Sequence, residues 1–175
     1  MSHPTTTRVD PPQQGDERTL LLAYLDYHRQ TLRQKAGGLD AAQLAATLPP
    51  SEMTLGGMVK HLALVETSWM CERFRGEELD EPWASVDWEA DRDWDWHSAA
   101  EDSPEEIWAL YEREIATADR VIAGAALDDV SARGAGARRE PFTLRWVLLH
   151  LIEEYARHNG HADLIRESID GQTGE

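Results

Sequence analysis

The chain has 175 residues, a length that suits one domain, and 41% of them are apolar, which is typical of a folded globular protein. Its formal net charge is −16, and such a surface repels phosphate backbones and anionic membranes, so we expect neither nucleic acid nor membrane partners. Cys71 is the only cysteine, which excludes an intramolecular disulfide and a zinc site built from cysteines.

The N-terminal residues differ in composition from the rest of the chain. Residues 1–15 are rich in proline and poor in apolar side chains, so they are predicted to form a flexible tail. They lack the apolar stretch of a secretory signal, and no later run approaches the roughly 20 apolar residues of a membrane span, so we expect a cytoplasmic protein. A single domain is predicted over residues 16–171, followed by a short tail at 172–175.

Four segments have the apolar spacing of amphipathic helices. The third begins with a capping box formed by Ser103 and Glu106, with proline at the first helical position, and the fourth is stopped by Gly171. No segment has the sustained alternation of a β-strand. The sequence therefore predicts an all-α four-helix bundle. The expected helices cover residues 16–37, 54–75, 103–126 and 143–170.

A tryptophan-rich acidic crossover loop separates the second predicted helix from the third. It covers residues 80–102, and two interpretations of its aromatic side chains are open. The tryptophans either pin a long loop against the bundle or line the mouth of a pocket, where aromatic walls are common. The four residues are Trp83, Trp88, Trp94 and Trp96.

The fourth predicted helix carries a polar stripe within an apolar border. His150, Glu154, His158 and His161 fall within about 80° of one another around the helix axis. Polar groups in such a place are costly to bury unless something satisfies them, and a metal ion would do so. Glu154 and His158, one turn apart, project in parallel, although such a pair also occurs on solvated helix faces.

A histidine on the second predicted helix adds a third candidate ligand. His61 is flanked by Met58, Leu62 and Val65, so it points toward the core. A lone core histidine is usually a hydrogen-bonded structural residue, but with Glu154 and His158 it makes a set of two nitrogen ligands and one oxygen ligand. That set suits zinc, nickel, iron or manganese and leaves positions open for water or substrate.

Two sequence blocks carry a resemblance to a known family. The segment Gly-Gly-Met-Val-Lys-His61-Leu-Ala and the block Glu154-Tyr-Ala-Arg-His158-Asn-Gly-His161 resemble the DinB/YfiT-like metalloproteins, which are four-helix bundles. The resemblance spans residues 17–171. Many members have histidine in both late positions, whereas Glu154 is similar to the mycothiol-dependent branch typified by maleylpyruvate isomerase.

The resemblance implies a thiol-dependent S-transferase or isomerase that acts on small electrophiles. Its cofactors would be one divalent metal ion and a low-molecular-weight thiol such as mycothiol. The metal would be held by His61, Glu154 and His158, with zinc as the first candidate and nickel, iron or manganese as alternatives. His161 would orient a ligand or carry a proton. Arg157 and Arg145 would pair with carboxylates of the thiol or substrate, or else form surface ion pairs. Bundles of this type often form homodimers.

Two other functions stay open on the residues alone. The same metal set could activate water for hydrolysis of an amide or ester bond. Alternatively, the chain could be a non-catalytic metal-binding stress-response protein. Cys71 has no evident base partner and is expected to be a buried structural thiol.

Overall fold

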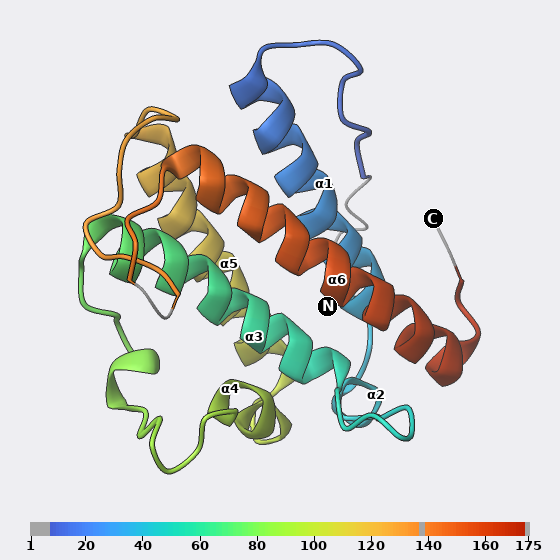
Figure 1. Cartoon of the computed structure of the whole chain (residues 1–175). Coiled ribbons are helices and arrows are strands. Elements are labelled where there is room, and N and C mark those ends of the chain that lie inside the picture. The colour runs from blue at the N-terminus through green and yellow to red at the C-terminus, as the bar shows by residue number, and fades with distance from the viewer. Residues whose placement is uncertain (1–7, 137–138, 174–175) are drawn as a thin grey trace.

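The computed structural model describes residues 8–136 and 139–173, and within these ranges the chain is helical, with isolated β-bridges and no strand. The predicted all-α bundle is confirmed (Figure 1). The predicted tails, residues 1–15 and 172–175, lie partly outside the described residues. The long helices are α1 (Glu17–Ala36), α3 (Leu55–Thr67), α5 (Pro104–Ala123) and α6 (Leu144–Asp170).

Side chains that the sequence singled out define the helix starts. Asp16 accepts a hydrogen bond from the Thr19 amide at the start of α1, which satisfies an amide that has no partner within the helix. Ser103 and Glu106 form the predicted capping box at the start of α5. The helix boundaries therefore follow local chemistry that can be recognised in the sequence.

The longest helix, α6, lies against α1 and α3, and α3 lies against α5 (Figure 1). Apolar side chains from all four helices meet in one core, among them Leu25, Leu62, Tyr111 and Leu148. Burial of this surface supplies most of the stabilisation of such a bundle. The arrangement places the polar stripe of α6 next to α3.

The second predicted helix changes type before it ends. It is α-helical up to Thr67 and continues as a π-helix, η1 (Ser68–Arg75). The amide of Gly76 donates to the carbonyl of Cys71, five residues earlier, and Gly76 ends the helix with a left-handed φ of 75°. Because a π-turn contains an extra residue, the face that η1 presents is rotated relative to a continuous α-helix. Apolar periodicity does not distinguish these two helix types over two turns.

The crossover loop contains short helices, of which η2 (Trp83–Ser85) and α4 (Trp94–His97) carry tryptophans. Trp83 is buried, and the rings of Trp83 and Trp88 each contact the ring of Trp94 edge-on. The ammonium group of Lys60 lies 4.4 Å from the centre of the Trp94 ring. These three tryptophans hold the loop against the bundle, as the first interpretation predicted.

A buried polar network ties the four long helices together. Glu66 on α3 is wholly buried and accepts two hydrogen bonds from Arg29 on α1, at 2.6 and 2.7 Å. It also accepts one at 3.0 Å from the hydroxyl of Tyr155 on α6, which is bonded in turn to the Tyr111 hydroxyl on α5. Burial raises the pKa of Tyr155 well above its usual value, so the hydroxyl stays protonated and can donate. The network fixes the position of α6 at Tyr155, the residue that follows Glu154.

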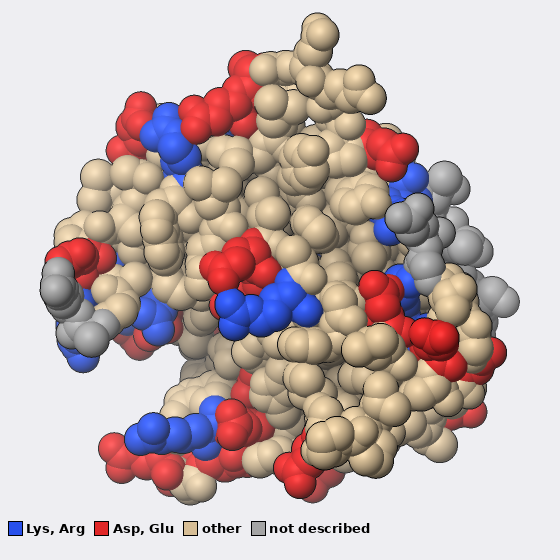
Figure 2. All heavy atoms as spheres, turned by 45° about the vertical axis from the view of Figure 1, so that its right-hand side comes forward, with Lys and Arg blue, Asp and Glu red and all other residues tan. Residues whose placement is uncertain are grey.

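The surface carries charges of both signs despite the acidic excess. On the face drawn in Figure 2, acidic side chains adjoin basic ones at several points, with uncharged surface between them. At the N-terminal end of the described chain, Arg8 donates to Thr31 and lies over the ring of Tyr27 on α1.

No helix in the described part of the chain combines the length and apolar character needed to cross a membrane.

Candidate metal centre

The three predicted metal ligands converge between α3 and α6. One ligand atom each from His61, Glu154 and His158 lies within 4.8 Å of the other two. Ligand atoms around a tetrahedral zinc ion are about 3.3 Å apart, so modest side-chain rotation would bring these atoms into one coordination shell. The two histidine ring centres are 5.0 Å apart. Two imidazoles and one carboxylate are a donor set that fits a divalent metal.

The cluster is partly shielded from solvent and partly accessible. The His158 side chain is 10% exposed, whereas those of Glu154 and His61 are 21% and 23% exposed. Three partly accessible protein ligands leave coordination positions for a water molecule or an incoming ligand, as in catalytic rather than structural zinc sites.

His158 is in the protonation state that a metal ligand requires. Burial, with smaller contributions from His61, His161 and Arg157, lowers the pKa of His158 to about 4, so its imidazole is neutral at pH 7. Its Nε2 atom lies 3.6 Å from a Glu154 oxygen, on the side where the ligand atoms meet. Its Nδ1 atom is buried and has no hydrogen-bond partner among the described residues.

The crossover loop supplies a residue that the sequence analysis missed. Asp95 on α4 has a side chain that is only 4% exposed, and its Oδ2 atom lies 2.7 Å from Nδ1 of His61. A carboxylate on one ring nitrogen fixes the tautomer of a histidine and leaves the other nitrogen, here Nε2, to bind a metal. Asp95 is one of many acids in the loop, and spacing alone could not identify it.

The fourth loop tryptophan forms a wall of the same site. The ring of Trp96 stacks on His61 at 4.8 Å and lies 5.6 Å from the ring of His158. A glycine on α3 permits this approach, because a Cβ atom at Gly57 would be 2.8 Å from the Trp96 ring. Trp96 therefore lies against two of the candidate ligands, and the second interpretation, in which the tryptophans line the mouth of a pocket, stays a prediction for this residue.

His150 extends the polar stripe away from the cluster. Its Nε2 atom lies 3.5 Å from a Glu154 oxygen. Its ring stacks on Trp146, with ring centres 5.1 Å apart, and contacts Trp69 on η1 edge-on at 4.4 Å. His150 thus lies between the candidate metal ligands and a group of aromatic side chains near the start of α6.

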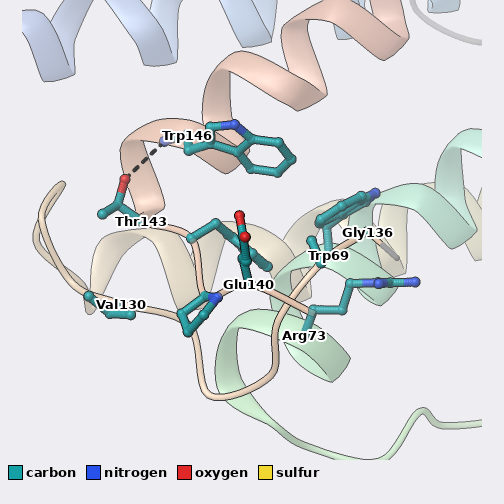
Figure 3. Close-up of a pocket in the computed structure, with 10 residues that line it drawn as sticks. Trp69, Arg73, Val130, Gly136, Glu140, Thr143 and Trp146 are labelled. Carbon is teal, nitrogen blue, oxygen red and sulfur yellow. Dashed lines mark hydrogen bonds between the residues drawn. The ribbon is translucent and has the colours of Figure 1, made fainter. Parts of the chain in front are cut away.

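These aromatic side chains form part of a hollow of about 830 Å³, which we call the aromatic hollow. Figure 3 shows it between Trp146 of α6, Trp69 and Arg73 of η1, and the segment that carries Glu140. Aromatic walls with a few polar groups are typical of small-molecule sites. The lining consists of Trp69, Arg73, Val130, Ala135, Gly136, Glu140, Pro141, Phe142, Thr143 and Trp146.

The other predicted site residues lie at different distances from the cluster. The ring of His161 is 5.9 Å from that of His158, and its buried Nδ1 atom has no hydrogen-bond partner in the described part of the chain. Arg157 pairs with Glu153 on the exposed side of α6. Arg145, near the start of α6, forms ion pairs with two acidic residues, Glu17 and Asp128.

Cys71, the only thiol of the chain, lies apart from the ligand cluster. It is buried on η1, and burial raises its pKa above the usual value for a cysteine. A thiol in that environment is a poor nucleophile at neutral pH. The geometry agrees with a structural role, so any reactive sulfur at the cluster would have to come from a bound molecule.

The comparisons with known proteins agree with the geometry. A family model described as mycothiol-S-transferase matches residues 20–171, which is most of the chain. A search of curated proteins found no match. The family match confirms the resemblance to the mycothiol-dependent branch of the DinB-like proteins. The chain therefore belongs to the mycothiol-S-transferase family.

Proposed function

We propose that this protein is a metal-dependent S-transferase that joins the sulfur of mycothiol to a small electrophile in the cytoplasm. The observation that carries the proposal is the convergence of His61, Glu154 and His158 within 4.8 Å in a partly exposed cluster. Family membership supports mycothiol as the thiol. The isolated, buried Cys71 supports a sulfur supplied by a bound molecule.

His61, Glu154 and His158 would hold the metal, with zinc as the first candidate for this donor set. A bound divalent cation supplies a Lewis acid, which lowers the pKa of a coordinated thiol. Asp95 keeps Nε2 of His61 available for binding, because it occupies the other ring nitrogen. The neutral His158 needs no deprotonation before it binds. These residues prepare the site before the thiol arrives.

In the proposed reaction, the sulfur–hydrogen bond of the thiol breaks and its electron pair forms a new bond to the electrophilic carbon. With a chloro-substituted substrate, the carbon–chlorine bond breaks and chloride leaves with its electron pair. His161, beside His158, is the proposed acceptor of the thiol proton, which it then releases to water. Arg157 would exchange its partner Glu153 for a carboxylate of the substrate, and Arg145 would act similarly at the start of α6.

The proposal is tested by metal analysis combined with X-ray absorption at the metal edge. We expect the purified protein to carry one metal per chain and to gain a sulfur neighbour when mycothiol is added. His158→Ala should lose most of the metal, whereas Leu164→Ala, an exposed position on the same helix, should keep it. Full occupancy in His158→Ala would refute the ligand assignment. A metal without a sulfur neighbour would refute the thiol transferase and favour hydrolysis.

Turnover is then measured with a chloronitroarene, whose reaction with a thiol releases chloride and changes its absorbance. We expect activity that needs both mycothiol and the metal. His161→Ala should retain the metal but lose about a hundredfold or more in kcat, the range usual for a proton-transfer residue. If His161→Ala instead loses the metal, His161 is a ligand and the assignment of its role is wrong.

A further inference from the structure

The aromatic hollow and the candidate metal ligands lie along one side of α6. Trp146, His150, Glu154 and His158 follow one another at intervals of four residues, so their side chains project from the same side of the helix. From Trp146 to Glu154, eight residues correspond to about 12 Å along the axis. The three side chains at the hollow end of this row are accessible: Trp146 is 44% exposed, and the His150 and Glu154 side chains are 18% and 21% exposed.

The hollow has a lining suited to an uncharged polar molecule with flat faces. Its aromatic rings offer apolar surfaces on which the C–H faces of a sugar or cyclitol ring can stack. Arg73 and Glu140 bring one positive and one negative charge, which supply donors and acceptors for hydroxyl groups without selecting an anion. The buried Nε atom of Arg73 has no hydrogen-bond partner among the described residues, although its guanidinium lies over the Trp69 ring.

Distance and chemistry together restrict the occupant. The ligand must reach about 12 Å from the metal ligands to the hollow, and the part in the hollow must be polar but uncharged. A small electrophile that reacts at the sulfur has neither the length nor the hydroxyl groups. Mycothiol has both, because its cysteine is joined through glucosamine to inositol.

We infer that the aromatic hollow binds the glucosamine–inositol part of mycothiol while its sulfur lies at the cluster of His61, Glu154 and His158. The inference rests on the proposed function and adds the recognition element that selects this thiol over shorter ones. Trp146 is a specificity-determining residue in this arrangement, since its ring lies between the hollow and His150. The electrophile would then approach the sulfur from solvent, to which the cluster is partly exposed.

The test compares two thiols on the metal-loaded protein by calorimetry. Mycothiol carries the glucosamine–inositol part, whereas N-acetylcysteine amide presents the same sulfur, with its carboxyl group also an amide, but without that part. For Trp146→Ala we expect the Kd of mycothiol to rise about tenfold, as is usual when a stacking aromatic residue is removed. The Kd of N-acetylcysteine amide should stay within twofold of its value for the unsubstituted protein. Arg73→Gln should show the same selectivity, and Leu149→Ala, exposed on α6 but outside the hollow lining, should change neither value.

Each other result would overturn the inference in a recognisable way. If Trp146→Ala weakens both thiols equally, Trp146 acts through His150 on the metal cluster and the hollow does not bind the sugar. If only the KM of the electrophile rises while the Kd of mycothiol is unchanged, the hollow holds the electrophile. If mycothiol binds the unsubstituted protein normally and neither variant changes its Kd, only the hollow assignment fails. If mycothiol does not bind the unsubstituted protein at all, the proposed function fails with it.

Discussion

Asp95→Asn tests whether the crossover loop tunes the metal centre. The 2.7 Å contact between Asp95 and His61 is shielded from water, because the Asp95 side chain is only 4% exposed. Asparagine keeps the shape and can still accept from Nδ1, so it removes the charge but not the hydrogen bond. Loss of a residue that orients a metal-bound histidine costs tenfold to a hundredfold in metal affinity, or about 1.4–2.8 kcal/mol. We expect metal affinity to fall about tenfold in Asp95→Asn and about a hundredfold in Asp95→Ala.

The assay is a zinc titration in competition with a chromogenic chelator at pH 7.5, where His158 is neutral in either variant. A matched control exists in the same loop, where Asp91 pairs with His97 on the exposed surface. Asp91→Asn should leave the zinc affinity unchanged. Equal zinc affinity in Asp95→Asn and the unsubstituted protein would refute the orienting role. Equal losses of zinc affinity in Asp95→Asn and Asp91→Asn would refute it as well. Circular dichroism checks that both remain helical.

Gly57→Ala should displace the ring of Trp96 and raise the zinc Kd severalfold; unchanged near-UV circular dichroism and zinc affinity would contradict the close approach described above. Glu66→Ala leaves the buried guanidinium of Arg29 with one partly exposed partner, so urea denaturation should show a loss of about 3–5 kcal/mol, and a loss under 1 kcal/mol would exclude an important network. Because burial raises its pKa, Cys71 should alkylate more slowly than free cysteine, with the rate rising at a higher pH, and Cys71→Ser should keep full transferase activity.

The sequence was most informative where local rules dominate. Capping side chains and apolar periodicity predicted the long helices, and helical spacing placed Glu154 and His158 on one face. Bringing His61 to them depends on the packing of α3 against α6, but its apolar flanks indicated the direction. These residues could be predicted because each belongs to a regular helix whose geometry is known in advance.

The missing parts of the site depend on irregular structure. Asp95 and Trp96 reach His61 from a loop, whose path is set by tertiary contacts and not by periodicity. The aromatic hollow depends on a π-helix, which carries Trp69 and Arg73, and on the segment before α6. Neither feature has a sequence signal as strong as a helix cap, so the residues could be suspected only from their chemical type.

The short helix α4 performs two tasks, and they cannot be independent. Trp94 anchors the crossover loop on the bundle, and the next two residues, Asp95 and Trp96, orient and cover His61. Thermodynamic reciprocity then requires that metal binding stabilise the docked loop by the same free energy with which the docked loop strengthens metal binding. Metal content would therefore control the local opening of residues 80–102, and amide hydrogen exchange in this loop would slow as the metal concentration rises.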